Sequence, residues 1–183
     1  MDSLRLCMHR RAFTLVELLV VIAIIGLLST IAVTALGPSK MNARNTKRKA
    51  DLLQITKALE LYYADNGAYP STGAAWCCVT GEWGCSNSAD SGLTGWIPNL
   101  APTYMATLPR DPNTGKTNQS SADSTCRTST AANTYLYRSI DGTDYKLLAY
   151  CTPEGTMSSA DSFYDPARPN TAWALYTPGA RNW

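Results

Sequence analysis

Histidine is almost absent from this 183-residue chain, and its one copy, His9, lies near the N-terminus. If that N-terminal stretch is removed, nothing remains for Ser-His-Asp or Cys-His catalysis or for a histidine-containing metal site. Charged residues are also scarce, at 16%. No pair of acidic residues stands at a spacing that indicates glycosidase chemistry. The sequence therefore predicts a protein that is not an enzyme.

Excess positive charge is lacking as well, once the chain is divided. The formal net charge of +2 comes from the first twelve residues, which hold three arginines and one aspartate, so the remainder is neutral. Overall basicity therefore does not indicate a nucleic-acid-binding protein. The length suits one compact domain, and an apolar share of 45% excludes disorder of the whole chain.

The strongest feature is an apolar run from Phe13 to Leu36 that contains one charged residue, Glu17. As a helix the run would be about 36 Å long, enough for a hydrocarbon core of about 30 Å. It is longer than the apolar region of a secretory signal peptide. Basic residues stand on both sides of it, so the orientation of a span stays open. A simple membrane anchor is one interpretation.

Glu17 needs a further explanation, because a carboxylate within a membrane span costs on the order of 3 kcal/mol. A cut between Ala12 and Phe13 would create an amino group on the same helix. In an assembly, that positive terminus would pair with Glu17 of a neighbouring subunit, and the attraction would be weakly screened among apolar helices.

The segment Arg11-Ala12-Phe13-Thr14-Leu15-Val16-Glu17, followed by the apolar run, resembles the class III signal of type IV pilins and pseudopilins. The resemblance implies that a prepilin peptidase cuts between Ala12 and Phe13, that Phe13 is then N-methylated, and that Glu17 guides assembly into a helical filament. Family members almost always have Gly before the cut. Ala12 is small enough that processing is expected here.

An amphipathic helix is predicted from 38 to 66, with an apolar stripe formed by Leu52, Ile55, Leu59 and Tyr62. Asn66-Gly67 supplies its C-terminal stop. The basic cluster at 40–49 is read as a solvated face, with contacts to lipid headgroups, an acidic neighbour or DNA as alternatives. The helix is expected to be interrupted or weakened at Gly37-Pro38. By resemblance, Gly26 with Gly37 and Pro38 would provide helix flexibility.

The remainder is predicted to be a small antiparallel sheet with long loops. Residues 135–140 and 145–149 form a hairpin signal around Asp141-Gly142, and 173–176 is a candidate third strand. The fold class is α+β: a long N-terminal helix packed on a small antiparallel β-sheet headgroup. The segments are a leader (1–12), a transmembrane and assembly helix (13–37), the amphipathic helix (38–66) and the headgroup (67–183). Residues 66–70 and 108–112 resemble pieces of the major pseudopilin of type II secretion.

Five cysteines follow Phe13, and an exported headgroup favours disulfides; they are Cys77, Cys78, Cys85, Cys126 and Cys151. Fifteen ways exist to draw two bonds among five thiols. Cys126–Cys151 is preferred, because it would close the loop before the hairpin onto its second strand. Cys85 would then bond to Cys77 or Cys78. Without a CxxC pair, a zinc site is not favoured.

No cofactor is required by the sequence, and calcium is one candidate. Major pseudopilins of type II secretion bind calcium near the segment that matches Asp111 here, and Asp161 and Asp165 offer further oxygen ligands. The family's calcium loop is not reproduced residue for residue. Capped turns are the competing interpretation of these aspartates.

The leading hypothesis is a structural subunit of a type IV pilus-like filament for adhesion, motility or secretion. Its partners would be copies of itself, the prepilin peptidase, an assembly ATPase and a platform membrane protein. It would cross the inner membrane once before assembly and then enter a periplasmic or cell-surface filament. A DNA-uptake pseudopilin is an alternative that salt-sensitive DNA affinity would favour. A signal-anchored exported enzyme or binding domain is another, which a lack of processing would favour.

Overall fold

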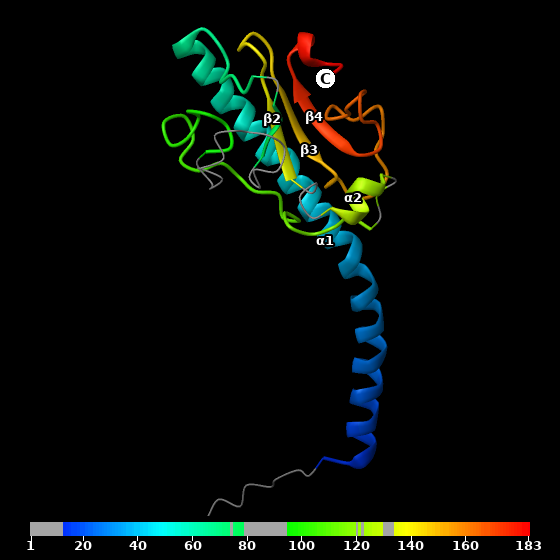
Figure 1. Ribbon diagram of the computed structural model, residues 1–183. Helices are drawn as coiled ribbons and strands as arrows, with labels where there is room; N and C mark the ends of the chain where they lie inside the picture. The colour runs from blue at the N-terminus through cyan, green and yellow to red at the C-terminus, as the bar shows by residue number, and fades with distance from the viewer. Residues whose placement is uncertain (1–12, 74, 79–94, 120, 122, 130–133) are drawn as a thin grey trace, which may run out of the picture. The chain divides into compact units, whose positions relative to one another are not determined.

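The computed structural model describes residues 13–73, 75–78, 95–119, 121, 123–129 and 134–183, with only the backbone at 30–36 and 78 (Figure 1). The elements, in chain order, are α1 (Leu15–Asn66), β1 (Cys77–Cys78), α2 (Ser124–Thr128), β2 (Thr134–Arg138), β3 (Lys146–Tyr150), β4 (Ala172–Tyr176) and the short 3₁₀ helix η2 (Pro178–Ala180). One long helix and a small sheet give an α+β fold, as predicted.

The chain divides into an N-terminal unit, Met1–Lys40, and a C-terminal unit, Met41–Trp183. Helix α1 belongs to both and contains Pro38 without a break. Helix α1 is therefore not interrupted at Gly37-Pro38, whereas a weakening of the helix there stays a prediction. The division between the units falls two residues later. Within the described residues, no helical stretch combines the length and the apolar character that crossing a membrane requires.

The sheet is antiparallel throughout, with strand order β1-β2-β3-β4. The predicted hairpin is confirmed: Leu136 stands opposite Leu148, and Ala149 is in turn paired with Trp173 of the predicted third strand. The two-residue strand β1 extends the sheet beside β2 and was not predicted individually, because so short a strand has no measurable alternation of apolar residues.

The main core lies between the sheet and the part of α1 that belongs to the C-terminal unit (Figure 1). The predicted stripe is confirmed, because Leu52, Ile55 and Leu59 are fully buried. They pack with side chains from alternate positions of the strands, among them Tyr135 and Leu147. Alternation along the strands places these residues on one face of the sheet.

The opposite face of the sheet is also covered, with Leu136, Leu148, Ala172 and Ala174 buried there. Trp76, Tyr150 and Tyr176 pack against this smaller cluster. Both faces of the central strands are therefore shielded from water, which explains why β2 and β3 carry so few polar residues.

Glycine ends the long helix and turns the hairpin at the two predicted places. Gly67 has a φ of 71°, and its N–H donates to Tyr63 O at 2.8 Å. Gly142 has a φ of 85°, and a Cβ there would stand 3.0 Å from Tyr69 O. Both positions need the left-handed conformation that glycine adopts at little cost.

Two leucines of α1 provide a test of this packing. Leu59 is 0% exposed and Leu61 is 58% exposed. Leu59→Ala is expected to lower the free energy of unfolding by about 2–5 kcal/mol, because it leaves a cavity in the core. Leu61→Ala, the matched control, is expected to change it by about 0.5 kcal/mol or less. Urea unfolding of the full chain in detergent, followed by tryptophan fluorescence, measures both. Equal effects of the two substitutions would contradict the packing.

Candidate assembly site and ion pairs

Helix α1 begins with a reciprocal cap that contains the predicted assembly acid. Glu17 Oε2 accepts hydrogen bonds from the backbone N–H and the hydroxyl of Thr14, each at 2.8 Å. The Glu17 N–H donates back to Thr14 Oγ1 at 3.2 Å. This Thr-x-x-Glu arrangement is a capping box, which satisfies donors at the start of a helix. Glu17 thus has a local partner within the single chain.

The described N-terminal part of α1 is apolar on all sides and exposed. Phe13 is 82% exposed and Leu15 is 80% exposed. The other large apolar side chains that are exposed in this part are Val16, Leu18, Leu19, Val20, Val21, Ile22, Ile24, Ile25, Leu27 and Leu28. A helix that is apolar all round is stable when lipid or other helices surround it. This segment therefore calls for a partner outside the single chain.

The structure locates two of the other predicted N-terminal residues and does not test their roles. Gly26 and Gly37 lie within α1, and no atom beyond the neighbouring residues and the adjacent helix backbone stands within 4 Å of a Cβ built at either. Ala12, the predicted residue before the cut, lies outside the described residues. Cleavage, methylation and helix flexibility stay predictions.

The basic cluster of α1 is only in part the solvated face that its composition indicates, because Lys40 and Lys47 are exposed but Arg48 is not. Arg48 is 0% exposed, although arginine is seldom fully buried. Arg44 and Arg48 both bind Glu154, and Lys49 binds Asp161. These cations pair with acids of the same chain, and the sequence did not reveal these pairs because the partners are far away along it.

Arg48 lies at the centre of a buried network. Its Nε donates to Asp111 Oδ2 at 2.8 Å, and its Nη2 lies 3.3 Å from Asp111 Oδ1. Its Nη1 donates to Glu154 Oε1 at 2.9 Å and to Asn45 Oδ1 at 2.8 Å. The guanidinium is thereby bidentate to Asp111, which is the strong form of this pair.

The charges of the network shift the pKa values of its members. The hydrogen bond from Arg44, aided by Arg48, holds the pKa of Glu154 below its usual range. The same bond raises the pKa of Arg44. Glu154 was not among the predicted site residues, and a lone glutamate in a loop gives no signal that would have found it.

A second buried ion pair lies on the far face of the sheet. Lys146 Nζ donates to Asp165 Oδ1 at 2.7 Å, and both side chains are fully buried. Arg168 binds the other oxygen of Asp165 at 3.2 Å. Burial lowers the pKa of Lys146, and Asp165 partly opposes that shift.

The three predicted calcium ligands are thus held by three different cations. Asp111 binds Arg48, Asp161 binds Lys49 and Asp165 binds Lys146. Among the residues that the structure describes, no three acidic, cysteine or histidine side chains are grouped so that they would hold a metal ion. The structure does not bring the three aspartates together into one site.

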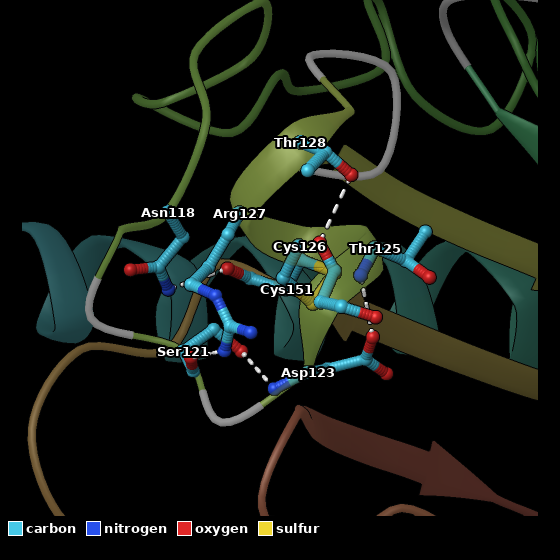
Figure 2. The surroundings of a disulfide bond; sticks show 9 residues. Asn118, Ser121, Asp123, Thr125, Cys126, Arg127, Thr128 and Cys151 are labelled. Atoms are coloured by element: carbon cyan, nitrogen blue, oxygen red, sulfur yellow. Dashed lines mark hydrogen bonds between the residues drawn. A yellow bond between two sulfur atoms is a disulfide. The ribbon is translucent and has the colours of Figure 1, made fainter.

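The preferred disulfide, Cys126–Cys151, is present (Figure 2). It joins α2 to the residue that follows β3. Hydrogen bonds surround it: Asp123 caps α2 by accepting from Thr125 N at 2.8 Å, and Asn118 Nδ2 donates to Cys151 O at 2.8 Å. The disulfide and these bonds hold a segment with little regular structure against the sheet.

Cys77 is disulfide-bonded as well. Its predicted candidate partner, Cys85, and the side chain of Cys78 lie outside the described residues. The second pairing therefore stays a prediction.

The tryptophans of the described residues contribute to packing. Trp96 and Trp173 belong to the main core, 3% and 5% exposed. Trp76 lies beneath the guanidinium groups of Arg138 and Arg168. These rings do not form the exposed aromatic platform that a carbohydrate-binding module uses.

The Glu154 network predicts a dependence of stability on acid. The pKa of Glu154 is lower in the folded chain than its ordinary value of 4.5, so the folded state gains stability above pH 4.5 and loses it as the pH falls below that value. Glu154→Gln is therefore expected to lower the melting temperature at neutral pH. Its melting temperature is also expected to fall less on acidification than that of the unaltered chain. Thermal melts between pH 7 and pH 3 measure both effects. Asp65→Asn, an exposed acid on α1, is the control; an equal change of its acid profile would contradict the assignment to Glu154.

The N-terminal segment of the chain is similar to a known family. The Prokaryotic N-terminal methylation motif matches residues 7–33. That range contains the predicted cut before Phe13, the acid Glu17 and all but the last three residues of the apolar run. No solved structure matches the chain.

Curated relatives carry the name Type II secretion system core protein G. The protein of Pectobacterium carotovorum subsp. carotovorum is 41% identical over 64 residues, which is 35% of this chain and 41% of that protein. The Dickeya chrysanthemi protein is 32% identical over 106 residues, covering 57% of this chain and 63% of that protein. For Pseudomonas aeruginosa the identity is 41% over 68 residues, covering 36% and 48%. The chain thus matches between 41% and 63% of the length of these three relatives.

The motif and these relatives agree with the residues that suggested the resemblance. The chain carries a prepilin-type N-terminal segment, and its predicted resemblance to the type IV pilins and pseudopilins, with proteins named Type II secretion system core protein G among its relatives, is confirmed.

Proposed function

We propose that the chain is a structural subunit that polymerises through its N-terminal helix into a type IV pilus-like filament, of the kind that type II secretion uses. The observation that carries the proposal is the exposed apolar segment of α1, which begins with the Thr14–Glu17 cap inside the methylation motif. The proposed role is mechanical and needs no catalytic group.

The exposed apolar area of α1 favours assembly. Burying apolar surface contributes roughly 25 cal/mol per Å², and nearly every large side chain from Phe13 to Leu28 is exposed in the single chain. A membrane can cover this surface before assembly, and neighbouring helices can cover it afterwards. Because the two environments are similarly apolar, the choice between them depends on polar interactions such as that of Glu17.

Several partners follow from the proposal. A prepilin peptidase would cut between Ala12 and Phe13 and methylate the new terminus. An assembly ATPase and a platform membrane protein would move the subunit from the inner membrane into a periplasmic or cell-surface filament. The names of the relatives favour secretion over adhesion or motility as the purpose of that filament.

The ion pairs argue against the nucleic-acid alternative. DNA binding by the basic cluster would need free cations, but Arg44, Arg48 and Lys49 are committed to acids of the same chain. The buried tryptophans likewise give little support to an exported carbohydrate-binding domain. The filament subunit is therefore the function that the geometry favours.

Substitutions at the helix start separate the charge of Glu17 from its capping role. Glu17→Gln keeps a side chain that completes a capping box but removes the charge, whereas Thr14→Ala removes the cap and keeps the charge. If Glu17 pairs with the amino terminus of a neighbour, Glu17→Gln is expected to reduce filament yield at least about tenfold, the effect of losing roughly 1.4 kcal/mol per contact. Thr14→Ala is expected to retain filaments. Filaments recovered from the cell surface and from the periplasm, compared with membrane levels by immunoblot, give the readout, and normal assembly of Glu17→Gln would contradict the pairing.

Processing is tested by the mass of the chain in its two locations. The filament-borne form is expected to begin at N-methylated Phe13, which intact-mass and N-terminal peptide mass spectrometry measure directly. Ala12→Gly is the matched variant and is expected to be processed at least as fast. A chain that retains Met1–Ala12 and stays in the membrane would exclude the filament function.

A further inference from the structure

The guanidinium of Arg48 occupies a position whose surroundings suit a cation. Its nitrogens contact four oxygens at 2.8–3.3 Å: both carboxylate oxygens of Asp111, Glu154 Oε1 and Asn45 Oδ1. Carboxylate and amide oxygens are also the ligands that calcium prefers. Here the side chain of Arg48 binds all four oxygens, and that side chain is fully buried.

The charge balance around Arg48 is complete without an ion. Two carboxylates, Asp111 and Glu154, face two guanidinium groups, Arg48 and Arg44. A divalent cation entering this cluster would lie beside a buried positive charge that cannot move into water without opening the core. The resulting repulsion in a medium of low dielectric constant opposes binding.

The other two aspartates are occupied in the same manner. Lys49 Nζ binds Asp161 and also lies 4.5 Å from the centre of the Trp173 ring. Lys146 and Arg168 take the two oxygens of Asp165, whose Oδ1 also accepts from the Ala167 N–H at 3.0 Å. Each acid therefore has a resident cation, and the residues present do not fit a shared calcium site.

We propose that Arg48, together with Lys49 and Lys146, supplies from within the chain the positive charge that calcium supplies in major pseudopilins, so that the C-terminal unit folds independently of calcium. Arg48 contributes most among these three cations. It replaces an exchangeable ion by a cation that is covalently part of α1, and it links that helix to the Asp111 and Glu154 loops.

The test compares calcium responses of the full chain in detergent. For the unaltered chain, the melting temperature in millimolar calcium and in a chelator is expected to agree within about 1 °C, because no site is available. Arg48→Ala is expected to lower the melting temperature by roughly 10 °C, since it leaves the buried carboxylate of Asp111 without its cation and removes one of the two cations from Glu154. The same variant is expected to regain several degrees in calcium, because the vacated oxygens can then receive the ion.

Arg44→Met is the matched control. It removes a cation from the same Glu154 but leaves Arg48 in place, so it is expected to stay unresponsive to calcium. A calcium-dependent rise of several degrees in the unaltered chain, or stoichiometric calcium binding to it by calorimetry, would overturn the proposal. Failure of calcium to stabilise folded Arg48→Ala would overturn the assignment of a cation position to Arg48. If that variant does not fold, the two measurements on the unaltered chain decide.

Discussion

Burial of one stripe of α1 against the sheet is the constraint on which the C-terminal unit depends. Leu52, Ile55 and Leu59 fill the core from that stripe, and Arg48 lies one turn before them on the same face. A guanidinium can occupy this face only if carboxylates meet it inside the protein. The loops that carry Asp111 and Glu154 are therefore fixed by the same helix face that fixes the strands.

The same helix meets opposite requirements in the two units. In the C-terminal unit its apolar residues form a stripe with polar residues around it, so the chain covers them itself. In the described part of the N-terminal unit apolar residues surround the helix axis, and the single chain leaves them exposed. The need for a membrane or for neighbouring subunits is thus a property of where apolar residues stand around α1. The proposed filament satisfies that need without altering the packing of the C-terminal unit.

Features that depend on neighbours in the sequence could be predicted, and those that depend on distant contacts could not. The hairpin follows from alternating residues on either side of Asp141-Gly142, and the helix end follows from Asn66-Gly67. The burial of Arg48 could also have been predicted, because the spacing 48, 52, 55 and 59 continues the apolar stripe by one turn. The partners of Arg48 could not be predicted, since 63 and 106 residues separate it from Asp111 and Glu154. Nor does the helix break at Pro38, although proline removes a backbone donor there: α1 runs on through it.

A cation built into the helix has a structural consequence that a bound ion would not share. A guanidinium is planar and donates along fixed directions, so its bonds to Asp111, Glu154 and Asn45 define the rotation of α1 relative to both loops. Calcium accepts six to eight oxygens in flexible geometry and leaves when its concentration falls. The Cys126–Cys151 disulfide ties α2 to the end of β3 by an equally permanent link. Long loops with little secondary structure are thereby held by bonds that belong to the chain, which suits a subunit that must keep its shape in the proposed periplasmic or cell-surface filament.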